Sequence, residues 1–149
     1  SCEIYSAWPT STITGNVLAI MSFTLNRVFT EWYRNQGYNF TITSSTAYDH
    51  KFIYGRNIFN SIAQVVDSVL TNYITKPGIE QPLLTQYCDG QRVSCPGWMT
   101  QWGSKYLGDQ GYDAVSILRQ QLSRHPKGPS GWNLWAPDRG VGPGISRSI

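Results

Sequence analysis

Hydrophobic residues recur every three or four positions in two long stretches of the chain. The first stretch runs from Ile13 to Tyr33, and the second, from Ile58 to Tyr73, has the more regular spacing. This period places the apolar side chains on one face of an α-helix, and Ser11 or Thr12 is available as the N-cap of the first helix. We therefore expect two long helices, each with one buried face.

Shorter segments have the patterns that are typical of strands. Tyr38 to Thr43 alternates apolar and polar residues, and Leu83 to Tyr87 forms a short run after Pro82. Asp113 can cap a third helix that extends to Leu122. Together these patterns predict an α+β fold in which two long helices pack on a small, mostly antiparallel sheet.

The chain divides into a patterned part and a tail. Residues 1–122 contain all the periodic segments, whereas residues 123–149 contain five Gly and four Pro and show no periodicity. We expect a single domain over 1–122 and an irregular tail over 123–149. Because the chain begins at Ser1 without Met and enters a patterned segment almost at once, we also expect that a segment upstream has been removed.

Composition narrows the function classes. The chain has 149 residues, 40% of them hydrophobic, and a net charge of +3 from Lys and Arg residues that form no runs. This charge pattern gives little support to nucleic-acid binding. The apolar runs are far shorter than the roughly 20 residues that span a bilayer, and the sequence lacks the common phosphate-binding and nucleophile-elbow motifs. We expect no nucleic-acid partner, no membrane span and no cofactor.

The cysteines leave two interpretations open. Cys88 and Cys95 bracket a loop that a hairpin could close into a disulfide, while Cys2 has no obvious partner. The alternative is that all three are reduced structural residues. His50 and His125 lie far from the cysteines in sequence and match no zinc spacing, so we expect no metal site.

Two features could carry chemistry. Glu3 lies beside Ile4 and Tyr5, and a carboxyl group placed against aromatic surface can hold a proton and deliver it near neutral pH. The alternative is an exposed glutamate near a chain end. The segment Gly97 to Tyr112 interleaves Trp and Tyr with Gln, Thr and Gly, a mixture that serves either sugar binding or ordinary helix packing.

Three segments carry a family resemblance: MTQWGSKYLGDQGYDAVSIL (Met99 to Leu118), CEIYSAWPTSTITGNVLAIMSF (Cys2 to Phe23) and ITSSTAYDHKFIYG (Ile42 to Gly55). They resemble, in that order, the Met-Ser-Gln-Trp-Gly-Ala core, the Ser-Glu-Met-Pro segment with its Ala-rich helix, and the Ser-Thr-Ala turn of the stage II sporulation protein D family, the SpoIID/LytB domain. The resemblance covers about residues 1–120.

The resemblance implies a lytic transglycosylase that cuts the glycan strands of peptidoglycan outside the cytoplasm, in the cell wall or spore envelope. Glu3 falls on the catalytic glutamate of the family. Such an enzyme can use the C6 hydroxyl of N-acetylmuramic acid as the nucleophile, so one carboxyl group suffices where ordinary glycosidases need two. Gln101 and Trp102, which fall on the Gln-Trp-Gly core, are expected to line or support the cleft, and Trp98, Tyr48 and His50 are further candidates for binding the substrate.

The chain also departs from the family pattern. Ile20 to Phe23 replaces a stretch that usually carries an Arg, and Ser94 to Gly97 replaces a Gly-His-Gly. The Cys and His residues that bind zinc in some members have no complete counterpart, so we expect no zinc. These departures favour an alternative, a non-catalytic module that binds peptidoglycan or the spore cell wall. A third hypothesis is a structural protein of the spore surface that assembles through its tail.

Overall fold

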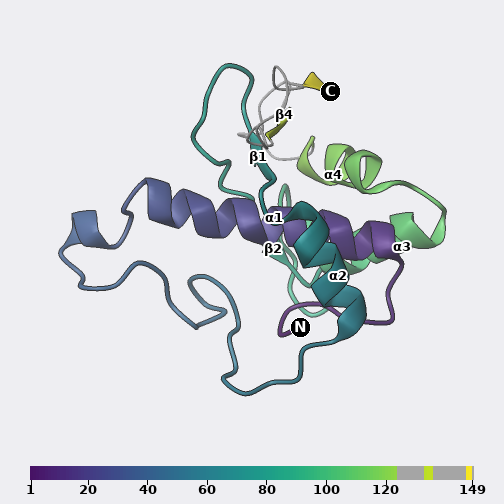
Figure 1. Cartoon of the computed structure of the whole chain (residues 1–149), viewed down its shortest axis with the longest axis horizontal. Helices are drawn as coiled ribbons and strands as arrows, with labels where there is room; N and C mark the ends of the chain where they lie inside the picture. The colour runs from purple at the N-terminus through teal and green to yellow at the C-terminus, as the bar shows by residue number, and fades with distance from the viewer. Residues whose placement is uncertain (124–132, 136–146, 149) are drawn as a thin grey trace.

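The computed structural model describes residues 1–123, 133–135 and 147–148 and shows a mixed α+β fold (Figure 1). The expected α+β class is confirmed. In chain order the elements are α1 (Thr10–Phe29), a 3-10 turn η1 (Arg34–Gln36), α2 (Asn60–Val69), β1 (Tyr73–Thr75), β2 (Tyr87–Cys88), β3 (Met99–Thr100), α3 (Gln101–Asp109), α4 (Ala114–Leu122), β4 (Asn133–Trp135) and β5 (Arg147–Ser148).

α1 runs through the middle of the molecule and is the one long helix among the described residues (Figure 1). The other three helices and β1 pack against it. The second expected helix is shorter than predicted, because α2 ends at Val69 and Tyr73 begins a strand instead. Apolar side chains from all four helices, β1 and β3 form one core, which includes Ile13, Leu18, Ile62, Val65, Ile74, Met99, Leu118 and Leu122.

The predicted start and end of the first helix were wrong. No side chain caps α1, because both expected caps, Ser11 and Thr12, lie inside the helix. Thr12 donates its hydroxyl proton to the Ser104 carbonyl, at 3.2 Å. The helix also ends before Tyr33, since Glu31 adopts a positive φ of 47°. This left-handed conformation is incompatible with a continuing right-handed helix.

The segment Tyr38 to Thr43 was expected to be a strand and is a loop. Its alternating aromatic residues pack on one another and on Tyr33, with ring centroids 4.8 Å apart for Tyr33 and Phe40. Alternation therefore arose here from a local aromatic cluster rather than from a sheet face. In the second expected strand, Leu83 to Tyr87, only Tyr87 belongs to a strand.

The strands form two small sheets. β1, β4 and β5 make an antiparallel sheet in which Ile74 pairs with Leu134. β2 and β3 make a parallel pair, with Tyr87 opposite Met99, which the expected antiparallel sheet did not include. No pattern in residues 123–149, which were predicted to be irregular, indicated β4 or β5. Beyond Ser123, the structure describes only the residues of these two strands, 133–135 and 147–148.

The ends of the short helices explain how α3 and α4 are placed. Asp113 caps α4 as predicted, accepting a hydrogen bond from the Ser116 amide at 2.8 Å. α3 approaches the start of α1 so closely that a Cβ on Gly108 would collide with the Thr12 hydroxyl. Asn16 completes this contact by donating to the Ser104 hydroxyl at 2.7 Å. The contact fixes the first turn of α3, from which Gln101 reaches the N-terminal segment.

Candidate functional site: an open cleft around Glu3

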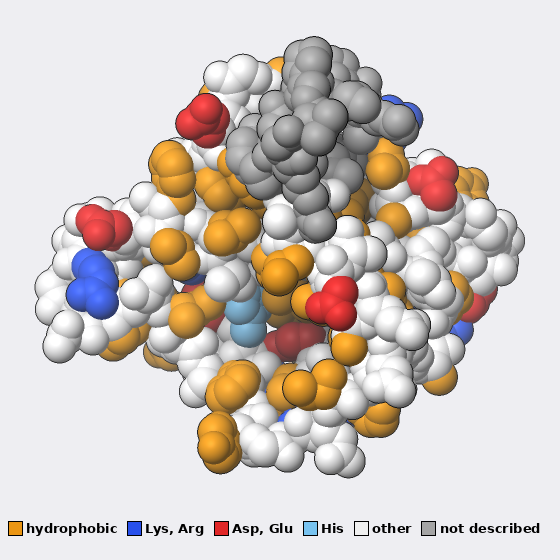
Figure 2. Space-filling view, in the orientation of Figure 1, with side chains coloured by type: hydrophobic (Ala, Val, Ile, Leu, Met, Phe, Trp, Pro, Cys, Tyr) orange, Lys and Arg blue, Asp and Glu red, His pale blue; other side chains and the backbone are white. Residues whose placement is uncertain are grey.

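A cleft of about 1230 Å³ opens between the N-terminal segment, α1, the loop 42–58 and α2. Most of its wall is apolar, but polar and charged side chains, among them His50, Lys51 and Arg56, also belong to the lining. Figure 2 shows one hollowed face of the molecule, where histidine and acidic side chains lie recessed among hydrophobic ones. The apolar lining residues include Val17, Ile20, Met21, Ile42, Ile53, Ile62 and Val66, and the acidic ones are Glu3 and Asp67.

Glu3 is held in this cleft from two sides. Its carboxylate accepts a hydrogen bond from the Lys51 backbone N–H, and its backbone carbonyl accepts one from Gln101 Nε2 at 3.0 Å. Gln101 is buried at the first position of α3, and Ile4, next to Glu3, is buried in the core. The main chain is therefore fixed at Glu3 although its side chain stays half-exposed to the cleft.

His50 and Tyr87 form a hydrogen-bonded pair behind Glu3. His50 Nδ1 lies 2.6 Å from the Tyr87 hydroxyl, and its Nε2 lies 2.9 Å from the Thr24 hydroxyl. Burial lowers the pKa of His50 to about 4, so the ring is neutral at pH 7. Burial, followed by the charge of Glu3 and a hydrogen bond with it, raises the pKa of Tyr87 well above its ordinary value, so the phenol keeps its proton.

A second polar cluster, around Asp49, anchors the residue next to His50. The Asp49 carboxylate accepts hydrogen bonds from Arg27 Nε at 2.9 Å, from the Tyr33 hydroxyl at 2.6 Å, and from the amide and hydroxyl of Thr43. Burial opposes its charged form, but these bonds together hold the pKa of Asp49 below its usual value. The cluster ties the loop 42–58 to the last turn of α1 and so positions His50.

The structure brings together three of the six residues that the resemblance implied for catalysis or substrate binding. Glu3 and His50 line the cleft, and Gln101 supports Glu3 from behind. Tyr48 is 70% exposed and is not among the lining residues. Trp102 is not among them either, because its ring packs on Trp8 with centroids 5.2 Å apart, against the core.

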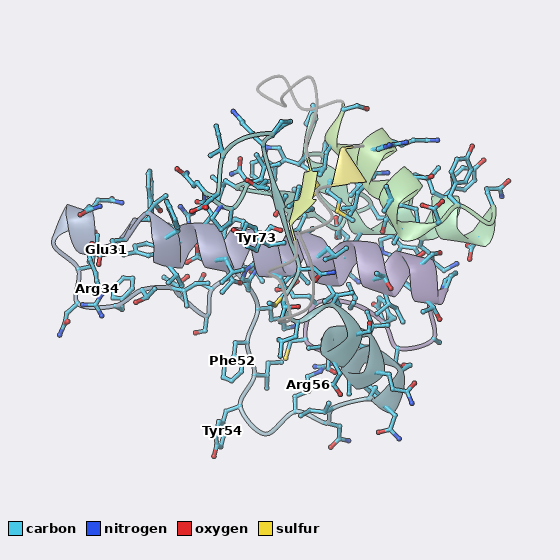
Figure 3. All side chains as sticks on the ribbon, turned by 45° about the horizontal axis from the view of Figure 1, so that its top comes forward. Glu31, Arg34, Phe52, Tyr54, Arg56 and Tyr73 are labelled. Carbon is cyan, nitrogen blue, oxygen red and sulfur yellow. A yellow bond between two sulfur atoms is a disulfide. The ribbon has the colours of Figure 1, made fainter. Side chains whose placement is uncertain are left out.

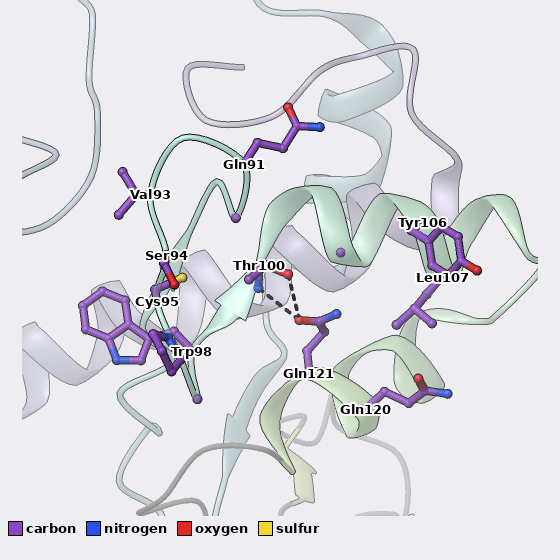
Figure 4. Close-up of a pocket in the computed structure, with 14 residues that line it drawn as sticks. Gln91, Val93, Ser94, Cys95, Trp98, Thr100, Tyr106, Leu107, Gln120 and Gln121 are labelled. Atoms are coloured by element: carbon purple, nitrogen blue, oxygen red, sulfur yellow. Dashed lines mark hydrogen bonds between the residues drawn. The ribbon is translucent and has the colours of Figure 1, made fainter.

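Trp98 lines a different pocket, of about 630 Å³, between the loop 90–98 and the helices α3 and α4 (Figure 4). The structure joins Cys88 and Cys95 in a disulfide, and Cys95 lines this pocket together with Tyr106 and Gln120. The structure therefore does not bring Trp98 together with Glu3. Trp98 lies three residues before Gln101, and this short separation is enough to place the two residues at different sites.

Sequence reasoning missed Tyr87, Thr24 and Lys51, although each contacts Glu3 or His50. Tyr87 stood at the end of a predicted strand and Thr24 inside a predicted helix, and neither position has a local signal of chemistry. Near the mouth of the cleft, Phe52 and Tyr54 project from the loop that precedes α2 (Figure 3). Their side chains are 65% and 93% exposed.

Comparison with other proteins adds no relative. No protein-family model, curated protein or solved structure matches the chain. The resemblance to the stage II sporulation protein D family therefore stays a prediction. In the described part of the chain, no three His, Cys, Asp or Glu side chains gather closely enough to hold a metal ion, and none of the helices combines the length and apolarity needed to cross a membrane.

Proposed function

We propose that this chain cleaves peptidoglycan glycan strands as a lytic transglycosylase, outside the cytoplasm, with Glu3 as the catalytic acid and base. The observation that supports the proposal is the position of Glu3 in an open cleft beside neutral hydrogen-bonding side chains: its carboxyl group accepts a bond from the Lys51 N–H, and its backbone carbonyl accepts one from the Gln101 side chain. The Cys88–Cys95 disulfide is compatible with an oxidising compartment.

The reaction needs one carboxyl group at two stages. Protonated Glu3 gives its proton to the glycosidic oxygen as the bond from C1 to that oxygen breaks. The Glu3 carboxylate then takes the proton of the C6 hydroxyl of N-acetylmuramic acid as O6 bonds to C1. The products are a 1,6-anhydro end and a new hydroxyl on the departing sugar, and Glu3 has regained its proton.

The cleft suits a saccharide chain in size and lining. A volume of about 1230 Å³ exceeds that of typical small-molecule pockets, which span roughly 300 to 1,000 Å³. The apolar faces of pyranose rings can pack on its wall, and its polar groups can orient the hydroxyls.

A second candidate function is a non-catalytic module that binds the same strands. The observation in its favour is the lining at Ile20 and Met21, where the family resemblance leads us to expect an Arg. Arg27, the one basic residue of α1, is engaged by Asp49 and cannot replace it, and the basic residues that do line the cleft, Lys51 and Arg56, come from the loop before α2 instead. In this alternative, Glu3 would contribute to binding and no bond would be broken.

The test compares wild type with Glu3→Gln on purified, peptide-free glycan strands. We expect soluble products with 1,6-anhydro-N-acetylmuramic acid ends, detected by mass spectrometry, and a rate that falls roughly 100- to 10,000-fold in the variant because the proton donor is lost. Glu31→Gln is the matched control, since Glu31 lies at the far end of the molecule (Figure 3) and should leave the rate unchanged.

Other product patterns would contradict the proposal. Reducing ends would show hydrolysis, with Asp67, the other acidic residue of the cleft lining, as the candidate second carboxylate. Equal activity of wild type and Glu3→Gln would remove Glu3 from the chemistry. Strands that bind without being cut would establish the binding module instead.

A further inference from the structure

The pocket that Trp98 lines lies apart from the Glu3 cleft and takes no part in the reaction proposed above. Its volume of about 630 Å³ is typical of small-molecule sites, which span roughly 300 to 1,000 Å³. The loop 90–98 forms one wall, and α3 and the end of α4 form the other (Figure 4). None of its lining residues also lines the Glu3 cleft. The two sites can therefore hold different ligands or different parts of one ligand.

The wall formed by the loop 90–98 is held by three kinds of contact. The Cys88–Cys95 disulfide closes the loop. The Asp89 carboxylate accepts hydrogen bonds from three successive backbone N–H groups, those of residues 91–93, at 3.0 to 3.1 Å. The Asp89 carbonyl accepts another from the backbone N–H of Trp102 in α3, at 3.1 Å. The wall is therefore ordered before a ligand arrives, which lowers the entropic cost of binding.

Thr100 and Gln121, on the other side of the pocket, also hold each other in place. Gln121 Oε1 accepts hydrogen bonds from the Thr100 N–H at 3.0 Å and from the Thr100 hydroxyl at 3.2 Å. A Cβ on Gly103 would lie 2.1 Å from that hydroxyl oxygen, so a glycine is needed at this close approach. The amide nitrogen of Gln121 lies on the side away from Thr100 (Figure 4) and can donate to a ligand.

The lining offers hydrogen-bonding groups but no charge. None of the residues that line the pocket is Asp, Glu, Lys, Arg or His. The polar ends of four lining side chains form no hydrogen bond with the described part of the chain, and these are Gln91, Ser94, Tyr106 and Gln120. Carboxamide and hydroxyl groups both donate and accept. The pocket therefore suits a ligand that is uncharged and carries both donors and acceptors.

Two exposed aromatic side chains, Trp98 and Tyr106, complete the lining. Figure 4 shows them at opposite ends of the pocket in that view, with Gln91 and Gln121 between them. Trp102 belongs to the same segment of the sequence, but its ring packs on Trp8 and the core and is not available. Free aromatic faces beside free amides are the combination that binds a sugar, because the rings pack on its C–H faces while the amides bind its hydroxyls.

We propose that this pocket is a second binding site, which takes an uncharged saccharide of the β-linked N-acetylhexosamine class. The acetamido group of such a sugar has one N–H and one carbonyl, which match the carbonyl and NH₂ of the glutamine side chains. Trp98 and Tyr106 supply the surfaces on which the sugar rings pack. The inference goes beyond the proposed function and does not depend on Glu3 or on cleavage of a bond.

A proline-rich peptide is the other uncharged ligand that packs on aromatic side chains. Its backbone offers carbonyl acceptors but no N–H at proline. The carbonyl oxygens of Gln91 and Gln120 would then have no donor from the ligand, whereas the hydroxyls and the acetamido N–H of a sugar supply donors as well as acceptors. The lining therefore favours the saccharide.

The test titrates the full chain with triacetylchitotriose, an uncharged β-linked trimer of N-acetylglucosamine. Calorimetry measures the affinity, and the indole ¹⁵N–H signals show which tryptophan meets the sugar. We expect saturable binding that shifts the signal of Trp98, assigned by its loss in Trp98→Phe, and leaves that of Trp32 unchanged. Glu3→Gln should shift the Trp98 signal with the same affinity as wild type, because Glu3 does not line this pocket.

Substitutions in the pocket test both kinds of contact. Trp98→Ala should weaken binding about tenfold or more because the packing surface is lost, and Trp98→Tyr, which keeps a ring, should restore most of the affinity. Trp32→Ala is the matched control, since Trp32 is also exposed but lines neither of the two pockets.

Gln120→Ala should weaken binding roughly three- to tenfold, as expected for one hydrogen bond, while Gln110→Ala, outside the pocket, should have no effect. Gln120→Ala and Tyr106→Ala decide the question if Trp98→Ala does not fold.

Several results would overturn the proposal. They are the absence of chitotriose binding by wild type, binding that leaves the Trp98 signal unshifted, and binding that Trp98→Ala and Gln120→Ala do not weaken. A proline decamer that shifts the Trp98 signal where chitotriose does not would assign the pocket to a peptide instead. Failure of the proposed function is distinguishable, because a chain that cuts no glycan strands but binds chitotriose at Trp98 loses only the catalytic role of Glu3.

Discussion

Two carboxylates at neighbouring places in the molecule have opposite surroundings. The side chain of Asp49 is fully buried and accepts four hydrogen bonds from Arg27, Tyr33 and Thr43. Glu3 lies half-exposed in the cleft, and its carboxylate accepts a hydrogen bond from the backbone N–H of Lys51, two residues after Asp49 in the chain. The first carboxylate has no remaining access to a ligand, whereas the second does.

The difference separates a structural carboxylate from a candidate catalytic one. A carboxylate that is saturated with donors holds its charge and fixes the groups around it, as Asp49 does for the loop 42–58. A general acid must exchange its proton with a substrate, so it needs an open side. Position in the cleft, more than residue type, therefore directs attention to Glu3.

The largest expected effect comes from breaking the saturated cluster. Asp49→Asn leaves the Arg27 guanidinium, whose side chain is only 10% exposed, without a counter-charge. We expect the free energy of unfolding in urea to fall by about 3 to 5 kcal/mol. Glu3→Gln, measured in the same way, should change it by less than about 0.5 kcal/mol. Similar losses in both variants would remove the distinction between the two carboxylates.

A smaller effect is expected in the pH dependence of the free energy of unfolding, which His50 should dominate. The folded pKa of His50, about 4, lies below the unfolded value of 6.5, so between these values only the unfolded chain takes up the proton. Stability is therefore lost as pH falls from about 6.5 to 4. We expect a loss of about 2 kcal/mol, reduced from the full shift because the ring borders the open cleft.

The two clusters titrate in different windows. The pKa of Asp49 is lowered, so its contribution is present above the ordinary carboxyl range and is lost only as pH falls through its lower folded value. Urea titrations from pH 7 to 4.5 should therefore show a slope that disappears in His50→Gln and persists in His125→Gln. A slope that persists in His50→Gln would assign it to another group.

The smallest expected effect tests the support behind Glu3. Gln101→Ala removes the hydrogen bond from Nε2 to the Glu3 carbonyl, and we expect a loss of about 1 kcal/mol in the free energy of unfolding. Cleavage of glycan strands should slow as well, since Glu3 is no longer held in place. Gln110→Ala, at the exposed end of α3, is the control. Equal effects of the two variants would show that Gln101 does not position Glu3.

Several features of the fold could be predicted from local pattern. The stripe that begins at Ile13 predicted α1, and the Asp113 cap predicted the start of α4. The end of α1 could not be predicted, because the positive φ of Glu31 has no signature in its side chain. The loop conformation of residues 38–43 could not be predicted either, because their alternation of apolar and polar residues reflects aromatic packing on Tyr33. The sequence did not decide the role of the segment that forms α3, since its aromatic and polar residues suit helix packing or a sugar site equally.

The candidate site also has a part that the sequence predicted and a part that it did not. Glu3 and His50 were singled out from a resemblance that depends on order along the chain, and both line the cleft. Trp98 and Trp102 come from the same segment, yet one faces a second pocket and the other packs on Trp8. Trp98 and Trp102 are only four positions apart, yet they lie on different sides of the start of α3. Their spacing in the sequence did not predict this difference.

The sequence by itself determined the α+β class, the long first helix and the presence of a carboxyl group among aromatic residues near Ser1. These depend on periodicity and on neighbours in the chain, which act over a few residues. Only the tertiary structure decided which groups meet Glu3, because Lys51, Tyr87 and Gln101 reach it from 48 to 98 residues away. Such contacts depend on how α1, α3 and the loop 42–58 pack, and no local pattern encodes that packing.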